Sequence, residues 1–268
     1  MLREVSVLLS VICAALGDYQ SFNEAVFDLS FHYDNSTPHW PNALAFKFIK
    51  IIAQSDESAN WYASNDFCMG EHGGTHFDAP YHFNRDGWKV ADVPVSKLIN
   101  KGYVLDVEVL GDGATTADTM LQPRHIQQFE KKLFGEGGRL PADSILLIRF
   151  NWGRHYGTAE YYNVQKTDNE SELSLSFPGL SLEAAKLLVE RKIAGVGVDT
   201  ASLDPGKSKT FDAHRILSKA NIFGIENVHI PADLATYNDR FVIYAMPMKI
   251  LEGTGAPCRI LAVVPKKN

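Results

Sequence analysis

This chain has few cysteines, no excess of basic residues and no repeated or low-complexity segment. Its 268 residues include three cysteines, and 26 lysines and arginines against 32 aspartates and glutamates give a formal charge of −6. Nucleic-acid-binding domains carry a basic excess, so the charge argues against a nucleic-acid partner. The apolar fraction of 45% supports a substantial core, and α/β domains reach this length as one unit.

Two well-known catalytic motifs are also missing. The chain contains no G-x-S-x-G sequence, so hydrolysis by a Ser-His-Asp triad has no support. The GKS tripeptide at residues 206–208 resembles the end of a phosphate-binding loop, but Ala201 occupies the position of the first required glycine. The sequence therefore supports neither a serine nucleophile at a strand-to-helix turn nor a phosphate-binding loop of this type.

The N-terminal segment differs in character from the rest of the chain. Arg3 precedes an apolar core that is too short to cross a bilayer, which needs roughly 20 apolar residues. Ala15 and Gly17 have the small-x-small spacing of a cleavage site. We therefore expect a signal peptide over residues 1–17 and a mature chain over residues 18–268. The protein would be secreted or enter the secretory lumen without a membrane span; the alternative is a buried first strand.

Secretion would allow disulfide formation between cysteines and N-glycosylation of asparagines. Cys13 would leave with the leader, so Cys68 and Cys258 remain, either as a disulfide or as two buried thiols. Asn35 and Asn169 begin N-x-S/T tripeptides, which are glycosylation acceptors in the secretory pathway.

Strand-like and helix-like segments alternate along the mature chain. Runs of β-branched and aromatic residues predict strands, and apolar residues at helical spacing predict helices. No linker separates two parts, so we expect one mixed α/β domain. The expected strands cover residues 26–30, 44–52, 103–109, 144–150, 195–199, 241–246 and 259–264, and the expected helices cover residues 123–134, 182–192 and 210–220.

The segment EHGGTHFDAPYHF, residues 71–83, holds three of the nine histidines. In an extended chain His72, His76 and Asp78 share parity and point to one face. A straight strand would hold the first two about 13 Å apart, at ~3.3 Å per residue, whereas ligands lie only ~2 Å from their ion. The two adjacent glycines allow a bend. The segment therefore predicts a strand that folds around a metal ion.

Two further candidate residues lie near the C-terminal third of the chain. The helix expected over residues 210–220 has an apolar stripe, and His214 lies off this stripe. Such a position is more typical of a surface residue than of a ligand. Glu226 follows twelve residues later, at the end of a short apolar segment that we expect to be a strand. Pattern alone does not assign either residue to a site.

Taken together, these segments resemble the cyclase-like metal-dependent hydrolases, a family that includes bacterial-type kynurenine formamidases and isatin hydrolases. Residues 72–82 match the signature H-x-G-T-H-x-D-x-P-x-H. Residues 38–41 (PHWP) resemble the family's N-terminal substrate-facing segment, and residues 199–204 (DTASLD) resemble its D-[ST]-x-S-x-D stretch. His214 and Glu226 have its H-x11-E spacing. The pieces follow the family order over most of the mature chain.

The resemblance implies a metal site. His72, His76 and Asp78 would bind a first divalent ion, either Zn²⁺ or Mn²⁺. Asp78 would bridge to a second ion that His214 and Glu226 also hold. The family contains members with one ion and members with two, and both plans remain open for this chain.

The resemblance also implies roles for residues around the metal. His82 would be the proton donor and acceptor, and Trp40 would present a flat apolar face to an aromatic ring. Ser202 and Asp204 are candidates for positions behind the ligands, with a simple turn as the alternative.

The implied fold is of the swivelling β/β/α type, and the implied assembly is a homodimer or homotetramer. The implied function is hydrolysis of an amide bond in a small aromatic compound, N-formylkynurenine or an isatin-like lactam, by a water that the metal activates. A lactone or other cyclic-ester hydrolase with the same site is one alternative. A non-catalytic metal-containing binding protein is another, although such a protein has no need of His82.

Overall fold

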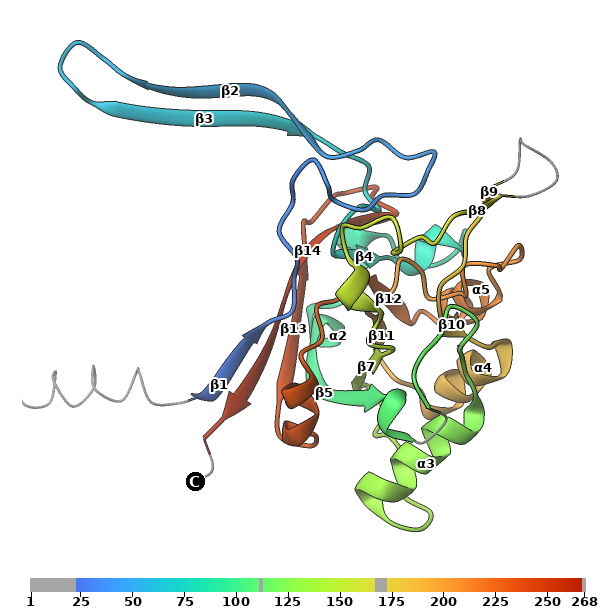
Figure 1. Ribbon diagram of the computed structural model, residues 1–268. Helices are drawn as coiled ribbons and strands as arrows, with labels where there is room; N and C mark the ends of the chain where they lie inside the picture. The colour runs from blue at the N-terminus through green and yellow to red at the C-terminus, as the bar shows by residue number, and fades with distance from the viewer. Residues whose placement is uncertain (1–22, 111–112, 167–172, 267–268) are drawn as a thin grey trace, which may run out of the picture.

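An eight-stranded mixed sheet forms the centre of the protein (Figure 1). The structure is a computed structural model that describes residues 23–110, 113–166 and 173–266. The expected signal peptide and Asn169 lie outside the described residues. In order across the sheet the strands are β1 (Asn23–Asp28), β14 (Gly255–Pro265), β13 (Val242–Pro247), β5 (Ile99–Asp106), β7 (Ile145–Arg149), β11 (Gly195–Val198), β12 (Phe223–Glu226) and β4 (His76–Asp78).

A further pairing between β14 and β4 closes this sheet. All of its strands except β1 thereby form a barrel-like ring. Strands β5, β7, β11 and β12 run parallel to one another, whereas β4, β13 and β14 pair in antiparallel fashion. The expectation of one mixed α/β domain is confirmed.

Three helices cover the outer face of the parallel strands (Figure 1): α3 (Pro123–Phe134), α4 (Leu182–Arg191) and α5 (Asp212–Lys219). Alternate strand residues point to opposite faces, so β5 contributes to two cores. Tyr103 and Leu105 join the core beneath the helices, and Val104 joins the core inside the ring.

The helices follow the sequence pattern closely. Helix α3 has the expected bounds and begins at Pro123, a position that tolerates a missing N–H. The Ser181 side chain caps α4 by accepting a hydrogen bond from the Ala184 N–H at 3.1 Å.

The other elements are α2 (Val95–Leu98), β6 (Met120–Leu121), β8 (Gln165–Lys166), β9 (Leu173–Ser174), β10 (Gly179–Leu180), and the 3-10 helices η1 (Pro80–His82), η2 (Val90–Asp92), η3 (Glu108–Leu110), η4 (Trp152–His155) and η5 (Ala232–Tyr237). No helix among the described residues is both long and apolar enough to span a bilayer.

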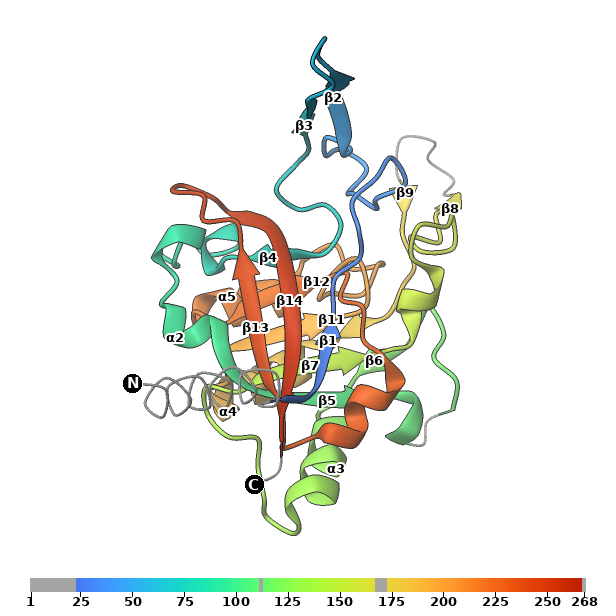
Figure 2. The same ribbon diagram turned by 90° about the vertical axis from the view of Figure 1, so that its left-hand side faces the viewer.

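A long hairpin projects from the body of the protein (Figures 1 and 2). It consists of β2 (Lys47–Ser55), which covers most of an expected strand, and β3 (Trp61–Cys68), which the sequence pattern did not predict. Cys68 ends β3 and Cys258 is buried in β14, and both thiols are free. The two cysteines therefore do not form the disulfide that the sequence left open.

Polar side chains gather where the parallel strands end, the edge at which α/β sheets place ligand sites. Asp199 directly follows β11 and accepts hydrogen bonds from the backbone N–H groups of Phe150 at 2.8 Å and Trp152 at 3.0 Å. Burial raises the pKa of Asp199 to about 6 although these N–H groups oppose the shift. Asp199 therefore fixes the loop after β7, while Glu226, at the end of β12, faces the neighbouring strand β4.

Candidate metal centre

The chain bends sharply between His72 and His76, as the sequence predicted. Gly74 has a φ of 58°, a left-handed conformation that favours glycine. A Cβ atom at this position would lie 2.6 Å from the Tyr33 ring, so a larger residue does not fit. After the bend, the chain enters β4 with His76 as its first residue.

Strand register brings distant residues to β4, which lies between β12 and β14. Glu226 of β12 is the direct partner of His76, and Gly255 of β14 is the direct partner of Asp78. A Cβ atom at Gly255 would lie 2.4 Å from Cε1 of His72. The glycine therefore leaves room for the His72 imidazole beside the Asp78 carboxylate.

His76 has a buried ring nitrogen that fits a cation. Its Nδ1 donates a hydrogen bond to the Gly74 carbonyl oxygen at 2.9 Å. The other ring nitrogen, Nε2, therefore carries a lone pair. Nε2 lies 3.3 Å from an Asp78 oxygen and 3.4 Å from a Glu226 oxygen, yet makes no hydrogen bond. A buried polar atom without a partner is costly, and a divalent ion between the three groups would satisfy all of them.

His214 enters the same cluster from α5. The Asp204 carboxylate accepts the His214 Nδ1–H at 2.6 Å and the His214 backbone N–H at 3.1 Å. This leaves Nε2 facing Glu226 at 3.0 Å and Asp78 at 3.3 Å. A carboxylate that orients a histidine in this way is typical of metal sites. Asp204 thus lies directly behind His214.

The surface position that the helical pattern indicated for His214 is wrong. His214 is only 4% exposed, because α5 also contacts η1 and β12. Helical periodicity identifies the face that packs on the main core and does not detect this second contact.

A chain of hydrogen bonds fixes His72. The Thr254 hydroxyl donates its only proton to Glu71 at 2.5 Å, so it accepts the His72 Nε2–H at 2.9 Å. His72 Nδ1 therefore presents a lone pair to an Asp78 oxygen at 2.6 Å. Two acceptors at this distance need a proton or a metal cation between them, which is a second indication of a cation site around Asp78.

His82 lies at the edge of the cluster on η1. Its ring stacks on the His72 ring with centroids 3.9 Å apart. Burial lowers the pKa of His82 to about 3 against the opposing effect of the Asp78 carboxylate. The imidazole is therefore neutral at pH 7 and is a weaker base than an ordinary histidine.

The candidate ligand atoms form two groups that share Asp78. His76, Asp78 and Glu226 form one, and His72, Asp78 and His82 form the other; within each group the ligand atoms lie within 4.8 Å of one another. Burial and the neighbouring Asp78 carboxylate raise the pKa of Glu226. Carboxylates buried side by side are stabilised by a cation. The second group also makes His82 a possible ligand, which differs from its expected role.

A cavity of about 350 Å³ opens onto this cluster. The expected substrate-facing residue Trp40 lines it because the Gly74 N–H donates to the Pro38 carbonyl oxygen at 2.8 Å, which holds residues 38–41 against the metal motif. Ser202 also reaches the cavity. The aromatic lining consists of Trp40, Phe83, Tyr162 and Phe211, and the cluster contributes His72, His82, His214 and Glu226.

Several residues of the site were not predicted from the sequence. For Phe83, the only signal in the sequence was its position directly after the histidine motif. Tyr162 and Phe211 lie in loops before β8 and α5 and belong to no motif. Glu71 and Thr254 position His72 from two segments that only the fold brings together.

Comparison with known proteins agrees with this geometry. A family model described as "Putative cyclase" matches residues 27–205. The chain is 31% identical to an isatin hydrolase of Roseibium aggregatum over 81% of each chain. It is 28% identical to a kynurenine formamidase of Bacillus cereus, over 87% of this chain and 94% of that one.

Solved structures agree as well. The crystal structure of an isatin hydrolase bound to the product analogue thioisatinate superposes with a TM-score of 0.79 at 28% identity, covering 97% of this chain and 99% of that chain. Isatin hydrolase A from Ralstonia solanacearum gives a TM-score of 0.77, also at 28% identity, over 96% of this chain and 97% of that chain. The chain therefore belongs to the cyclase family.

Proposed function

We propose that this chain is a metal-dependent hydrolase that opens an amide bond of a small aromatic compound, with N-formylkynurenine and isatin-like lactams as leading substrates. The observation that carries the proposal is the unpaired, buried Nε2 of His76 between the carboxylates of Asp78 and Glu226. The relatives named isatin hydrolase and kynurenine formamidase support the substrate class.

The residues around the cavity can perform this reaction. A bound divalent ion would lower the pKa of a water molecule and polarise the substrate carbonyl. Trp40 and the other aromatic walls would hold the substrate ring. His82, neutral at pH 7, would accept the proton that the attacking water loses and deliver it to the departing nitrogen. Water is thus added across the C–N bond, with its hydroxyl on carbon and its hydrogen on nitrogen.

We propose Zn²⁺ or Mn²⁺ as the ion, with one or two bound per chain. Imidazole and carboxylate ligands suit both metals. Asp78 presents one oxygen to His72 and His76 and the other to His214, which also faces Glu226, and this arrangement supports two ions. His72, His76, Asp78, His214 and Glu226 would hold them.

The direct test is turnover of isatin and N-formylkynurenine by the purified protein before and after chelation. We expect hydrolysis of at least one of them, loss of activity on removal of metal, and recovery with Zn²⁺ or Mn²⁺. Full activity in thoroughly demetallated protein would contradict the proposal. Turnover of a lactone but of neither amide would show that the site is an esterase.

We also propose that the chain forms a homodimer or homotetramer in which the β2–β3 hairpin contacts a second copy. Phe48, Ile51, Trp61 and Phe67 lie on one face of the hairpin by register and are 46–67% exposed. An isolated two-stranded hairpin is marginally stable in water, and an exposed apolar face of this kind marks an interaction site.

The swivelling β/β/α type remains our proposal for the closed sheet.

Light scattering during size-exclusion chromatography tests the assembly. Ile51→Glu should shift the protein toward monomer because it places a charge in the apolar face. The matched variant Lys50→Glu alters the opposite face and should stay assembled. A wild-type protein that is monomeric at micromolar concentration would refute the interface.

We propose that the protein is secreted or lumenal, on the strength of the leader pattern at residues 1–17. Expression in a secreting cell should yield a chain that begins near Asp18, and N-terminal sequencing would detect it. Glycosylation is expected at Asn35, which is exposed, or at Asn169. Folded protein that retains Met1 would rule out processing.

A further inference from the structure

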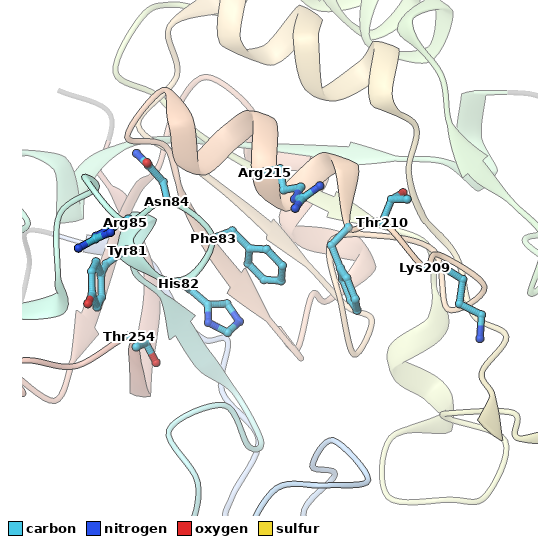
Figure 3. Close-up of a pocket in the computed structure, with 10 residues that line it drawn as sticks. Tyr81, His82, Phe83, Asn84, Arg85, Lys209, Thr210, Arg215 and Thr254 are labelled. Carbon is cyan, nitrogen blue, oxygen red and sulfur yellow. The ribbon is translucent and has the colours of Figure 1, made fainter. Parts of the chain in front are cut away.

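A second cavity adjoins the catalytic cavity (Figure 3). It has a volume of about 690 Å³ and lies between η1 with the loop after it and the loop that leads into α5. His82, Phe83 and Phe211 line both cavities. A ligand whose ring lies against the aromatic walls of the first cavity can therefore extend a substituent into the second.

The second cavity is lined by cations. Arg85, Lys209 and Arg215 belong to its lining, and no acidic residue does. All three are exposed, and none makes an ion pair with a carboxylate of the described residues. Other surface lysines do make such pairs, as Lys207 does with Asp118. In a chain of net charge −6, this is a local concentration of unpaired positive charge.

Figure 3 shows how the charges are arranged. His82 and Phe83 lie in the middle, Arg215 lies beside them on the helix, and Arg85 and Lys209 lie on opposite sides. The charged ends of Arg85 and Lys209 lie at the outer edges of the cavity, so the three side chains do not converge on one point. Such an arrangement raises the local concentration of anions and holds them weakly, because exposed ion pairs are individually weak.

We propose that this cavity, which we name the basic antechamber, attracts the carboxylate of an aromatic ligand whose ring occupies the catalytic cavity. The proposal rests on the proposed function. Two sources of carboxylate are compatible with it. N-formylkynurenine carries one as a substrate. Hydrolysis of a lactam creates one in the product: the attacked carbonyl carbon becomes the acid as the C–N bond breaks, so this carboxylate forms at the metal centre and would meet the antechamber as the product leaves.

Binding of benzoate and acetophenone, measured by calorimetry on the metal-loaded protein, tests the antechamber without any turnover, because neither probe has an amide or ester bond. The two probes share a ring and differ in charge. Arg215→Gln should weaken benzoate binding about two- to fivefold, the range of an exposed ion pair, and combining it with Arg85→Gln and Lys209→Gln should weaken it about tenfold or more. Acetophenone should lose less affinity than benzoate in each variant. Raising the salt concentration should weaken benzoate selectively.

Two controls separate this cavity from general electrostatics. Lys219→Gln removes one exposed positive charge from the far end of the same helix, and Arg215→Lys keeps the charge at position 215. Benzoate affinity should survive both changes. Equal weakening by Lys219→Gln and Arg215→Gln, or equal effects on benzoate and acetophenone, would overturn the proposal. Since neither probe is hydrolysed, a protein without amidase activity could still show the antechamber, and an active amidase could still lack it.

Kinetics with the triple variant then identify the source of the carboxylate. If the antechamber receives the substrate, KM for N-formylkynurenine should rise more than KM for neutral isatin. If it receives the product, inhibition by the ring-opened isatin product should weaken more than KM for isatin changes. An unchanged KM for N-formylkynurenine together with unchanged product inhibition would overturn the proposal.

Discussion

Replacing Asp78 by asparagine is expected to remove the bound metal and to reduce hydrolysis about a thousandfold or more, because metal activation of water and carbonyl contributes several kcal/mol. Asp78 belongs to both groups of candidate ligand atoms. The carboxylate presents Oδ1 to His72 and His76 and Oδ2 to His214, whereas an amide presents a single oxygen and cannot face both sides. Elemental analysis and turnover on the same sample measure the effect.

Asp86→Asn is the matched control, because Asp86 is exposed and belongs to neither ligand group. It should keep metal and activity. Elemental analysis of His214→Ala tests the number of ions, with a decrease from about two to about one if the site is a two-metal clamp. An Asp78→Asn protein that keeps its metal and its rate would show that the cluster is not the catalytic centre.

Replacing His82 by alanine is expected to reduce turnover about 10²- to 10⁴-fold, the usual contribution of a general acid–base, while metal content stays the same. The ring is neutral at pH 7, because burial lowers its pKa to about 3; it is therefore a weak base, and it would take the proton of a water that a bound metal has made acidic. Expulsion of nitrogen most needs a returned proton, and substrates with better leaving groups should therefore lose less rate.

The matched control for this variant is His32→Ala, since the side chain of His32 is 84% exposed. The contrary result has a clear structural meaning. If metal and activity disappear together in His82→Ala, then His82 is a ligand in the group with His72 and Asp78. If amides are hydrolysed at the wild-type rate, the proton comes from another residue, and Glu226 is the next candidate.

The part of the site that could be predicted from residue pattern is the part that is local in the chain. His72, His76 and Asp78 meet because one bend at Gly74 brings them together, and the glycines revealed that bend. Helix α3 was predicted with its observed bounds because its apolar face packs on one core. Periodicity is informative where burial is one-sided and continuous.

The remainder depends on contacts that no local pattern records. Glu226 reaches His76 through strand register, so its assignment came from family resemblance alone. Strand β3 was missed because polar residues, Ser64 to Asp66, interrupt it and because it packs on no core. The aromatic walls of the cavity come from loops, where a phenylalanine or tyrosine carries no signal of its own.

The position of β4 between β12 and β14 links metal binding to folding. Strand β4 pairs with β12 on one side and β14 on the other, so the three residues from His76 to Asp78 close the ring. These partners are separated by well over a hundred positions in the chain, and pairings of this kind form late and slowly. An unfolded chain therefore has no preformed metal site, and an ion that binds only the closed ring shifts the folding equilibrium toward it by mass action. Metal binding and closure of the barrel are therefore thermodynamically linked, so that each one favours the other.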